Sequence, residues 1–360
     1  MDKLIFIPAY KPDMRLPKLC GELSESYDVL VVDDGSGTNF DDVFDAASEF
    51  AKVLRYEKNR GKGGALKYGF SKIPELFPDA NFVITADADG QHTPEDIKKV
   101  ADKAESCDGL VLGSREFTGK VPARSAFGNT MTRWVFKLAS GVKVRDTQTG
   151  LRAFGKKYLS EFAALKGDRY EYEMTQLMYC AENKIPIHEV GIETIYENDN
   201  ETSHFHPIKD SFRIYKIIYL NSSFLKCVTS SILAFLIDFF IASVLQSRVF
   251  TATPLIDGPA FLQSIITSYS VSMTVAWIVS SLVNFFVNKK WAFHSDKSTI
   301  RSMLGFYALA APVFVLKAFV FTPILEAGSV SFKITYLIVN IAMYFFNYII
   351  QKKFIFKKKK

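Results

Sequence analysis

The chain has 360 residues, of which 48% are hydrophobic, and a formal net charge of +6. This length predicts about two domains. Residues 1–222 carry most of the acidic side chains, whereas the remainder holds four long apolar runs. Much of the Lys and Arg excess lies near those runs, including the terminal KKKK, which favours anionic membrane lipid over nucleic acid as a partner.

The opening residues, MDKLIFIPAY, predict a short strand and a turn rather than a secretory signal. We therefore expect the first domain, residues 1–222, to stay in the cytoplasm, where thiols are kept reduced. The cysteines lack the spacing of metal ligands, and no chemistry is assigned to them. They are Cys20, Cys107, Cys180 and Cys227.

Short β-rich runs alternate with helix-like stretches through the first domain. The runs are KLIFIPAY, DVLVVDDGS, KVLRYEKN, NFVITADADG and GLVLGSRE. This alternation favours an α/β, Rossmann-like fold with a mostly parallel sheet, whose ligands gather at the carboxyl ends of the strands. Polar motifs follow four of the runs, at positions 33–34, 60–64, 87–89 and 114–115, so we expect them to form one site.

Asp87 and Asp89 follow the fourth run directly. Two carboxylates at a sheet edge offer oxygen ligands to a divalent cation, which would neutralise a departing diphosphate. The alternative is a polar turn before a helix, because Thr93 and Pro94 have the character of an N-cap and a first helical residue.

Two further strand ends point to a nucleotide. Asp33 and Asp34 are candidates to accept hydrogen bonds from a base or ribose, although Asp-Gly pairs also form ordinary turns. NRGKGGALKYG ends a strand with glycines and opens a helix, which leaves Arg60 and Lys62 for phosphate. Its spacing is not that of a P-loop.

Seven motifs occur in one order: IPAYKPD, VVDDGS, NRGKGGALKYG, DADGQH, GSREF, DTQTGLRAF and YEYEM. Over about residues 4–220 the chain resembles family 2 glycosyltransferases of the polyprenol (dolichol)-phosphate mannose or glucose synthase type. The resemblance implies a GT-A fold, an inverting hexosyl transfer, and Mg²⁺ or Mn²⁺ held by Asp87, Asp89 and Gln91.

The same resemblance assigns the other site residues. It gives the acceptor phosphate to Arg115 and Arg124, which act in catalysis with Asp89. Asp146, Arg152 and Glu171 are donor-pocket or scaffold residues, and an ion-paired scaffold is the alternative. The nucleotide-sugar residues are Pro8, Ala9, Tyr10, Asp33, Asp34, Arg60, Lys62, Asp87, Gln148 and Glu173.

A phosphate acceptor sets the expected mechanism. A phosphate monoester is already anionic at neutral pH, so its oxygen attacks without a general base. Positioning and charge stabilisation should then supply the rate, and attack opposite the leaving diphosphate inverts the anomeric centre.

Residues 205–220 predict a helix that lies at the membrane interface. Ile208, Phe212, Tyr215 and Tyr219 fall near one helical face, and basic residues lie elsewhere. A linker helix docked on the first domain is the alternative.

The second domain, residues 223–360, predicts an all-α transmembrane domain of four helices, at about 225–246, 261–287, 303–325 and 334–350. Basic residues follow the second and fourth runs, which puts both termini in the cytoplasm. Asp238 and Lys317 lie inside apolar runs at similar depth, and we predict an ion pair between them, with binding of the lipid-linked phosphate as the alternative.

NFFVNKKWAF at 284–293 and NYIIQKKFIF at 347–356 share their order of Asn, paired Lys and aromatic residues. They predict either a repeated helical hairpin or two similar interfacial anchors. Over about 224–356 this half resembles the GtrA-like family of membrane proteins, whose proposed role is to handle polyprenyl-phosphate sugars.

The sequence thus predicts a multi-pass enzyme that moves a hexose from a nucleotide sugar to polyprenyl phosphate (undecaprenyl phosphate in a bacterium) for cell-envelope glycosylation. UDP-glucose is the favoured donor and GDP-mannose the alternative. A processive polysaccharide synthase would carry Gln-X-X-Arg-Trp, whereas Arg133-Trp134 lacks that context. A flippase with a vestigial catalytic domain is the other alternative, and a homo-oligomer is left open.

Overall fold

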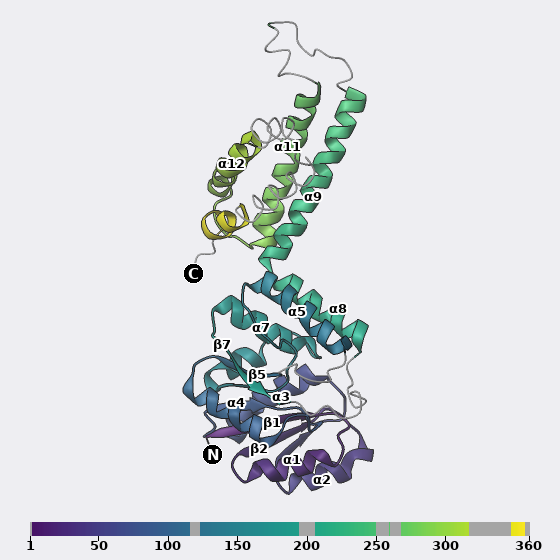
Figure 1. The fold of residues 1–360 in the computed structure, drawn as a ribbon, viewed down its shortest axis with the longest axis vertical. Helices are drawn as coiled ribbons and strands as arrows, with labels where there is room; N and C mark the ends of the chain where they lie inside the picture. Colours follow the sequence, from purple (N-terminus) through teal and green to yellow (C-terminus); the bar gives the residue numbers. More distant parts are fainter. Residues whose placement is uncertain are drawn as a thin grey trace. The chain divides into compact units, whose positions relative to one another are not determined.

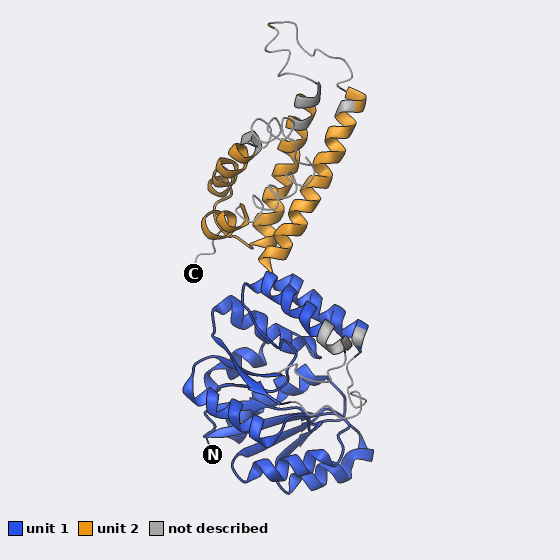
Figure 2. Cartoon of the chain, in the orientation of Figure 1, with its two compact units in different colours: residues 1–221 blue, residues 222–360 orange. Residues whose placement is uncertain are grey.

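The computed structural model describes residues 2–115, 123–193, 206–249, 259, 268–316 and 347–356. The chain divides into two compact units, Met1–Asn221 and Ser222–Lys360 (Figure 2).

The first unit is built on a seven-stranded sheet with the order β3-β2-β1-β4-β6-β5-β7. The strands are β1 (Lys3–Ala9), β2 (Asp28–Asp33), β3 (Lys52–Arg55), β4 (Phe82–Thr85), β5 (Leu110–Arg115), β6 (Arg152–Gly155) and β7 (Ile187–Ile192). The prediction of five strands is confirmed, whereas the sheet is mixed because β6 runs antiparallel to both β4 and β5. The other pairs are parallel.

Helices cover both faces of this sheet (Figure 1). They are α1 (Arg15–Ser24), α2 (Asp41–Ser48), α3 (Lys62–Leu76), α4 (Pro94–Ser106), α5 (Ala123–Ser140), α6 (Leu159–Ala163), α7 (Glu171–Asn183) and α8 (Pro207–Asn221), with short 3₁₀ turns η1 (Thr38–Phe40) and η2 (Lys156–Tyr158). Since side chains alternate across a strand, Ile5 and Ile7 enter one core. Phe6 enters the other, where its ring meets Phe70 edge-on at 5.5 Å.

Gly61 is the N-cap of α3 and has no room for a side chain. Its φ is +84°, and a Cβ there would lie 2.5 Å from the carbonyl oxygen of Asp168. The chain therefore brings the start of α3 against the segment before α7, two elements that both contribute to the site described below.

The second unit contains long apolar helices. They are α9 (Ser223–Val244), α11 (Ser268–Val287) and α12 (Thr299–Leu316), with π-helical turns η4 (Leu245–Val249), η5 (Asn288–Ala292) and η7 (Gln351–Ile355). Figure 1 shows α9 and α11 side by side. Within the described residues one helix, Ser223–Val249, is long and apolar enough to cross a membrane. Most of the predicted fourth run lies outside the described residues, so the count of four helices stays a prediction.

The two copies of the Asn-Lys-Lys-aromatic motif meet inside the second unit. Asn288 Nδ2 donates to Gln351 Oε1 at 3.1 Å, and the rings of Phe293 and Phe356 stack with centroids 5.1 Å apart. Asn288, Phe293 and Phe356 are all buried. Equivalent positions of the two copies therefore pack against each other.

Candidate active site

A cavity of about 500 Å³ opens at the carboxyl ends of β1, β2, β4 and β5. This is the edge of the sheet where the sequence placed its polar motifs, and the volume is in the range of small-molecule sites. The predicted residues that line it are Pro8, Ala9, Tyr10, Asp34, Lys62, Asp87, Asp89, Gln91, Arg115, Gln148 and Glu173.

Two predicted nucleotide residues do not line the cavity. Asp33 Oδ1 accepts from the Ser36 backbone N–H at 2.8 Å, and Asp33 Oδ2 accepts from Arg55 Nε at 3.1 Å. The Arg60 guanidinium lies over the ring of Tyr56, 4.5 Å from its centroid. Asp33 and Arg60 thus support the loops around the cavity.

Asp34 fixes the loop that leads into α3. Its Oδ1 accepts from the Tyr56 hydroxyl at 2.6 Å and from the Arg60 backbone N–H at 2.7 Å, and its Oδ2 accepts from Asn59 Nδ2 at 3.0 Å. Because Asp34 is 2% exposed, these bonds are protected from water. They hold the start of α3 in position to present Lys62.

Lys62 lies between two carboxylates. Its Nζ is 2.6 Å from Asp87 Oδ1 and 2.7 Å from Glu173 Oε1. Burial alone would lower the pKa of Lys62, but the charges of Asp87 and Glu173 outweigh it and raise that pKa. Burial likewise acts to raise the pKa of Asp87, whereas Lys62 and His92 bring it well below its usual range. Both groups are therefore charged at neutral pH.

Asp89 has a different environment from Asp87. Its Oδ1 accepts from the Gln91 backbone N–H at 3.1 Å, and no ion pair reaches its carboxylate within the described part of the chain. Burial and the neighbouring charge of Asp87 raise the pKa of Asp89. A bound cation would offset both effects.

Oxygen donors at this wall fit a hard divalent cation. Asp87, Asp89 and Gln91 all line the cavity. Among the described residues no group of three or more His, Cys, Asp or Glu side chains could hold a metal. A cation here would depend on two carboxylates, so positions would stay open for the diphosphate of a donor.

Gly150 allows Asp87 to occupy its position. A Cβ on Gly150 would lie 2.4 Å from Asp87 Oδ2, and the Gly150 carbonyl accepts from Thr85 Oγ1 at 2.9 Å. The loop that carries Gln148 therefore packs directly on the carboxylate of Asp87.

We predict that Gly150→Ala lowers turnover by about 10²-fold, because displacing a catalytic group by about 1 Å is enough for such a loss. The measurement is the turnover of the folded variant in the reaction that the sequence resemblance implies. Gly155→Ala is the matched control, since a Cβ there would lie 4.0 Å from its nearest neighbour. Equal rates for the two variants would contradict the role given to Gly150.

Arg115 is held by a buried partner. Its Nε and one terminal nitrogen donate to the two carboxylate oxygens of Asp146, which is fully buried. Asp146 Oδ1 also accepts from the Gln148 backbone N–H at 3.0 Å. This bidentate pair fixes the orientation of the guanidinium at the cavity. The side chain of Arg124, in the first turn of α5, lies outside the described residues.

Other family motif residues form the scaffold. Arg152 is 2% exposed and donates to the backbone oxygen of Thr149 and to Gln176 Oε1. Burial lowers the pKa of Arg152. Glu171 Oε1 accepts from the backbone N–H groups of Asp168 and Arg169 at the start of α7.

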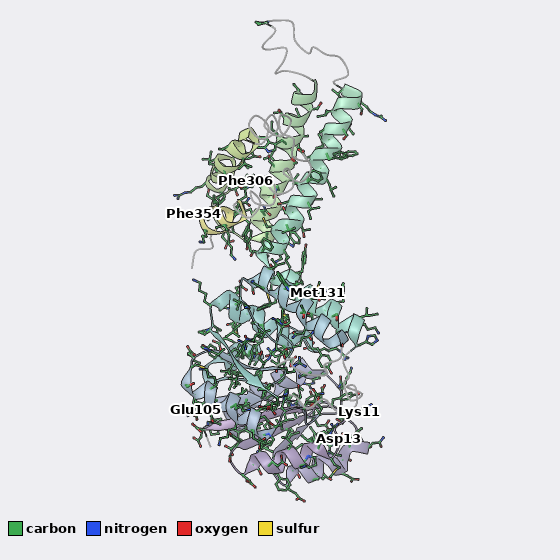
Figure 3. All side chains as sticks on the ribbon, viewed as in Figure 1. Lys11, Asp13, Glu105, Met131, Phe306 and Phe354 are labelled. Carbon is green, nitrogen blue, oxygen red and sulfur yellow. The ribbon has the colours of Figure 1, made fainter. Side chains whose placement is uncertain are left out.

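Sequence reasoning missed several lining residues. Lys11 and Arg15 follow β1, and Arg169 precedes α7. Arg15 also pairs with Asp13, 2.7 Å away, and Lys11 and Asp13, both labelled in Figure 3, line the cavity. The extra basic residues in IPAYKPDMR were the available signal, since a diphosphate site attracts cationic side chains.

In the second unit, Asp238 Oδ1 accepts from Ser280 Oγ at 3.1 Å, which joins α9 to α11. Lys317 lies outside the described residues. The ion pair between Asp238 and Lys317 stays a prediction.

Comparison with known proteins places the chain in a family. Residues 5–164 match the glycosyl transferase family 2 model, and residues 228–356 match the GtrA/DPMS transmembrane domain. The chain belongs to glycosyl transferase family 2, as its motifs predicted. Its second unit is a GtrA/DPMS transmembrane domain.

Two relatives and one solved structure are reported as similar to this chain. UDP-N-acetylglucosamine–dolichyl-phosphate N-acetylglucosaminyltransferase of Methanococcus voltae is 36% identical over 223 residues, which is 54% of this chain and 87% of that protein. Dolichyl-phosphate beta-glucosyltransferase of Drosophila melanogaster is 29% identical over 221 residues, 52% of this chain and 65% of that protein. One solved structure is glucosyl-3-phosphoglycerate synthase of Mycobacterium tuberculosis, in complex with Mn²⁺, UDP-glucose and phosphoglyceric acid. It is 14% identical, with a TM-score of 0.49, and the match covers 61% of this chain and 79% of that chain.

Proposed function

We propose that this glycosyltransferase moves glucose from UDP-glucose to polyprenyl phosphate at the cytoplasmic face of a membrane. The observation that carries the proposal is the cavity that Asp87 and Asp89 line together with the cationic residues Lys62 and Arg115. The carboxylates suit a cation bound to the diphosphate of a nucleotide sugar, and the guanidinium of Arg115 suits a phosphate acceptor. A relative named as a dolichyl-phosphate beta-glucosyltransferase supports glucose and the lipid phosphate, and a relative whose name gives UDP-N-acetylglucosamine as its substrate supports a UDP-linked donor.

The chemistry needs no general base from the protein. An acceptor phosphate oxygen forms the bond to the anomeric carbon while the bond from that carbon to the donor diphosphate breaks, and UDP leaves with the bonding electrons. A divalent cation, Mg²⁺ or Mn²⁺, bound at Asp87, Asp89 and Gln91 would supply positive charge to the leaving diphosphate. Lys62 holds Asp87 in place, and Arg115 is oriented to bind the acceptor.

The proposal is tested by incubating membranes that contain the chain with polyprenyl phosphate and radiolabelled UDP-glucose, GDP-mannose or UDP-N-acetylglucosamine. We expect label to enter the lipid fraction from UDP-glucose, with one sugar on each lipid. Growth of a polymer would instead indicate a processive synthase. Lipid labelling from another donor alone would contradict the choice of glucose.

Arg115→Lys is expected to weaken use of the acceptor. Lysine keeps one positive charge but loses the two-pronged contact with Asp146 and with a phosphate, a loss of about 1.5–3 kcal/mol. The KM for polyprenyl phosphate should rise by roughly tenfold or more, with little change in the KM for UDP-glucose. A rise confined to the donor KM would contradict the assignment. The same acceptor measurement on Arg124→Lys tests the second predicted arginine.

An exposed apolar face supports the predicted interfacial helix. On α8, Ile208 and Phe212 are 78% and 70% exposed, while Ile214 and Ile218 are buried. On α5, which contacts α8, Met131 (labelled in Figure 3) and Trp134 are exposed too. We propose that α5 and α8 together lie at the headgroups, since such a face is typical of interfacial helices.

When the full chain is in nanodiscs, we expect spin-labelled lipid to quench an environment-sensitive dye that is attached to the new cysteine of the Phe212→Cys variant. Phe50→Cys is the control, because Phe50 is an exposed aromatic residue of the same unit but follows α2. Equal quenching at the two positions would remove the interfacial role of α8.

A further inference from the structure

The carboxylate that orients Arg115 belongs to a loop. Asp146 lies in residues 145–148, between α5 and β6, and Thr147 and Gln148 of the same segment line the cavity. We call these residues the acceptor loop. The orientation of the Arg115 guanidinium therefore depends on the contacts that hold the acceptor loop in place.

Glu189 of β7 holds one side of the acceptor loop. Its Oε1 accepts from the Arg145 backbone N–H at 2.7 Å and from the Asp146 backbone N–H at 3.4 Å. The same oxygen accepts from Ser114 Oγ at 2.8 Å, and Ser114 precedes Arg115 on β5. One carboxylate oxygen thus ties the loop that carries Asp146 to the strand that carries Arg115.

The sheet brings Glu189 to this position. β5 and β7 are parallel neighbours, with Leu112 paired to Glu189 and Ser114 paired to Gly191. Ser114 is buried, so its hydroxyl would lose a protected hydrogen bond if Glu189 were shortened. Glu189 is not among the described residues that line the cavity. Any effect of Glu189 on the reaction must therefore pass through the groups that it contacts.

Asn129 of α5 holds the other side of the acceptor loop. Its Oδ1 accepts from Thr147 Oγ1 at 3.4 Å, and its Nδ2 donates to the Arg145 backbone oxygen at 3.4 Å. Asn129 is buried, although these bonds are longer than the two short bonds of Glu189. We therefore expect the loop to shift, rather than to unfold, when the Glu189 side chain is shortened.

We propose that Glu189 is a positioning residue of the acceptor site and sets the orientation of Arg115 through Ser114 and Asp146. The inference rests on the proposed binding of the acceptor phosphate by Arg115, and it adds the residue that fixes this arginine. A guanidinium forms two parallel hydrogen bonds with a phosphate only when its plane is turned correctly. A shift of the Asp146 carboxylate would turn that plane.

The effect should fall on the acceptor rather than on the donor. Gly150, which packs on Asp87, is held separately, because its carbonyl oxygen accepts from Thr85 Oγ1 at 2.9 Å. Glu189→Ala should therefore raise the KM for polyprenyl phosphate about tenfold, equivalent to about 1.4 kcal/mol, with little change in the KM for UDP-glucose. Glu189→Gln should keep most of the acceptor use, since an amide oxygen accepts the same hydrogen bonds.

Chemical modification of Arg115 tests the positioning directly, without donor or acceptor. Phenylglyoxal reacts with the two terminal nitrogens of a guanidinium, and Asp146 engages one of those of Arg115, whose side chain is 20% exposed. Peptide mass spectrometry of the full chain should show Arg115 modified several-fold faster in Glu189→Ala than in the wild type. Arg152 is buried and reports whether the fold stays intact.

His188→Gln is the matched control on the same strand. His188 Nε2 lies 3.0 Å from the backbone oxygen of Asp108, at the start of β5 rather than at the cavity. We expect this variant to change neither the modification of Arg115 nor the KM for the acceptor. In an Arg115→Lys background, Glu189→Ala should raise the acceptor KM by less than about twofold, because its effect passes through Arg115.

Three results would overturn the inference: equal modification of Arg115 in Glu189→Ala and His188→Gln, parallel increases at Arg115 and Arg152, or fully additive effects of Glu189→Ala and Arg115→Lys on the acceptor KM. The modification assay contains no substrate. If Arg115 responds to Glu189→Ala but the wild type labels no lipid, the proposed function alone is wrong. If lipid is labelled but Arg115 does not respond, the role of Glu189 alone is wrong.

Discussion

Asp89→Asn is expected to lower sugar transfer by about 10³-fold while the protein stays folded. Asparagine matches the shape of Asp89 and keeps an oxygen that can accept from the Gln91 N–H, now 3.1 Å from Asp89 Oδ1. It removes the charge that would hold a divalent cation against the donor diphosphate. Charge stabilisation of this kind is worth several kcal/mol, and about 4 kcal/mol corresponds to about 10³-fold in rate.

The measurement is turnover with radiolabelled donor, accompanied by thermal unfolding. Asp13→Asn is the matched control, because Asp13 also lines the cavity but is paired with Arg15. We expect Asp13→Asn to keep most of the activity. Excess EDTA should inhibit the wild-type enzyme as strongly as the substitution does. Undiminished turnover in EDTA would show that Asp89 does not act through a metal.

The five strands that carry the site were predictable because each is a compact apolar run that ends in polar residues. Two strands were missed: β7 (Ile187–Ile192) and β6 (Arg152–Gly155), which is no shorter than β3 and β4. β6 is a strand through its antiparallel bonds to β4 and β5, elements distant in sequence, and tertiary pairing of this kind leaves little local signal.

The site was predictable as a set of strand ends, but not in its individual side chains. Asp33 and Asp34 are neighbours in sequence, yet Asp33 pairs with Arg55 while Asp34 lines the cavity. Successive side chains at a strand end point to opposite sides, and a sequence does not state which side holds the ligand. Lys62 was predicted to bind phosphate, and its contacts with Asp87 and Glu173 appear only in three dimensions.

In the membrane half, too, the helices were predictable from the sequence and their packing contacts were not. Its apolar runs predicted long helices, and the repeated Asn-Lys-Lys-aromatic order indicated that two helix ends are related. The direct contact between Asn288 and Gln351 depends on how the helix ends pack, which the repeat alone does not specify.

Lys62→Met is expected to destabilise the first unit and to slow transfer. Side-chain exposures of 17% for Lys62, 28% for Asp87 and 8% for Glu173 place these charges largely out of water. Removing the lysine leaves two carboxylates facing each other without their shared partner. Breaking a buried pair in this way costs about 3 kcal/mol. The denaturant midpoint of unfolding should fall, and turnover should fall with it because Asp87 loses the contact that positions it.

Lys67→Met is the matched control on the same helix. Lys67 pairs with Asp168, whose side chain is 69% exposed, and an exposed pair contributes at most about 1 kcal/mol. The double variant Lys62→Met/Glu173→Gln should recover part of the stability lost in Lys62→Met, because it removes one of the two stranded charges. If Lys62→Met unfolds at the same denaturant concentration as Lys67→Met, and the double variant recovers nothing, then Lys62 is not the residue that balances the charge of this site.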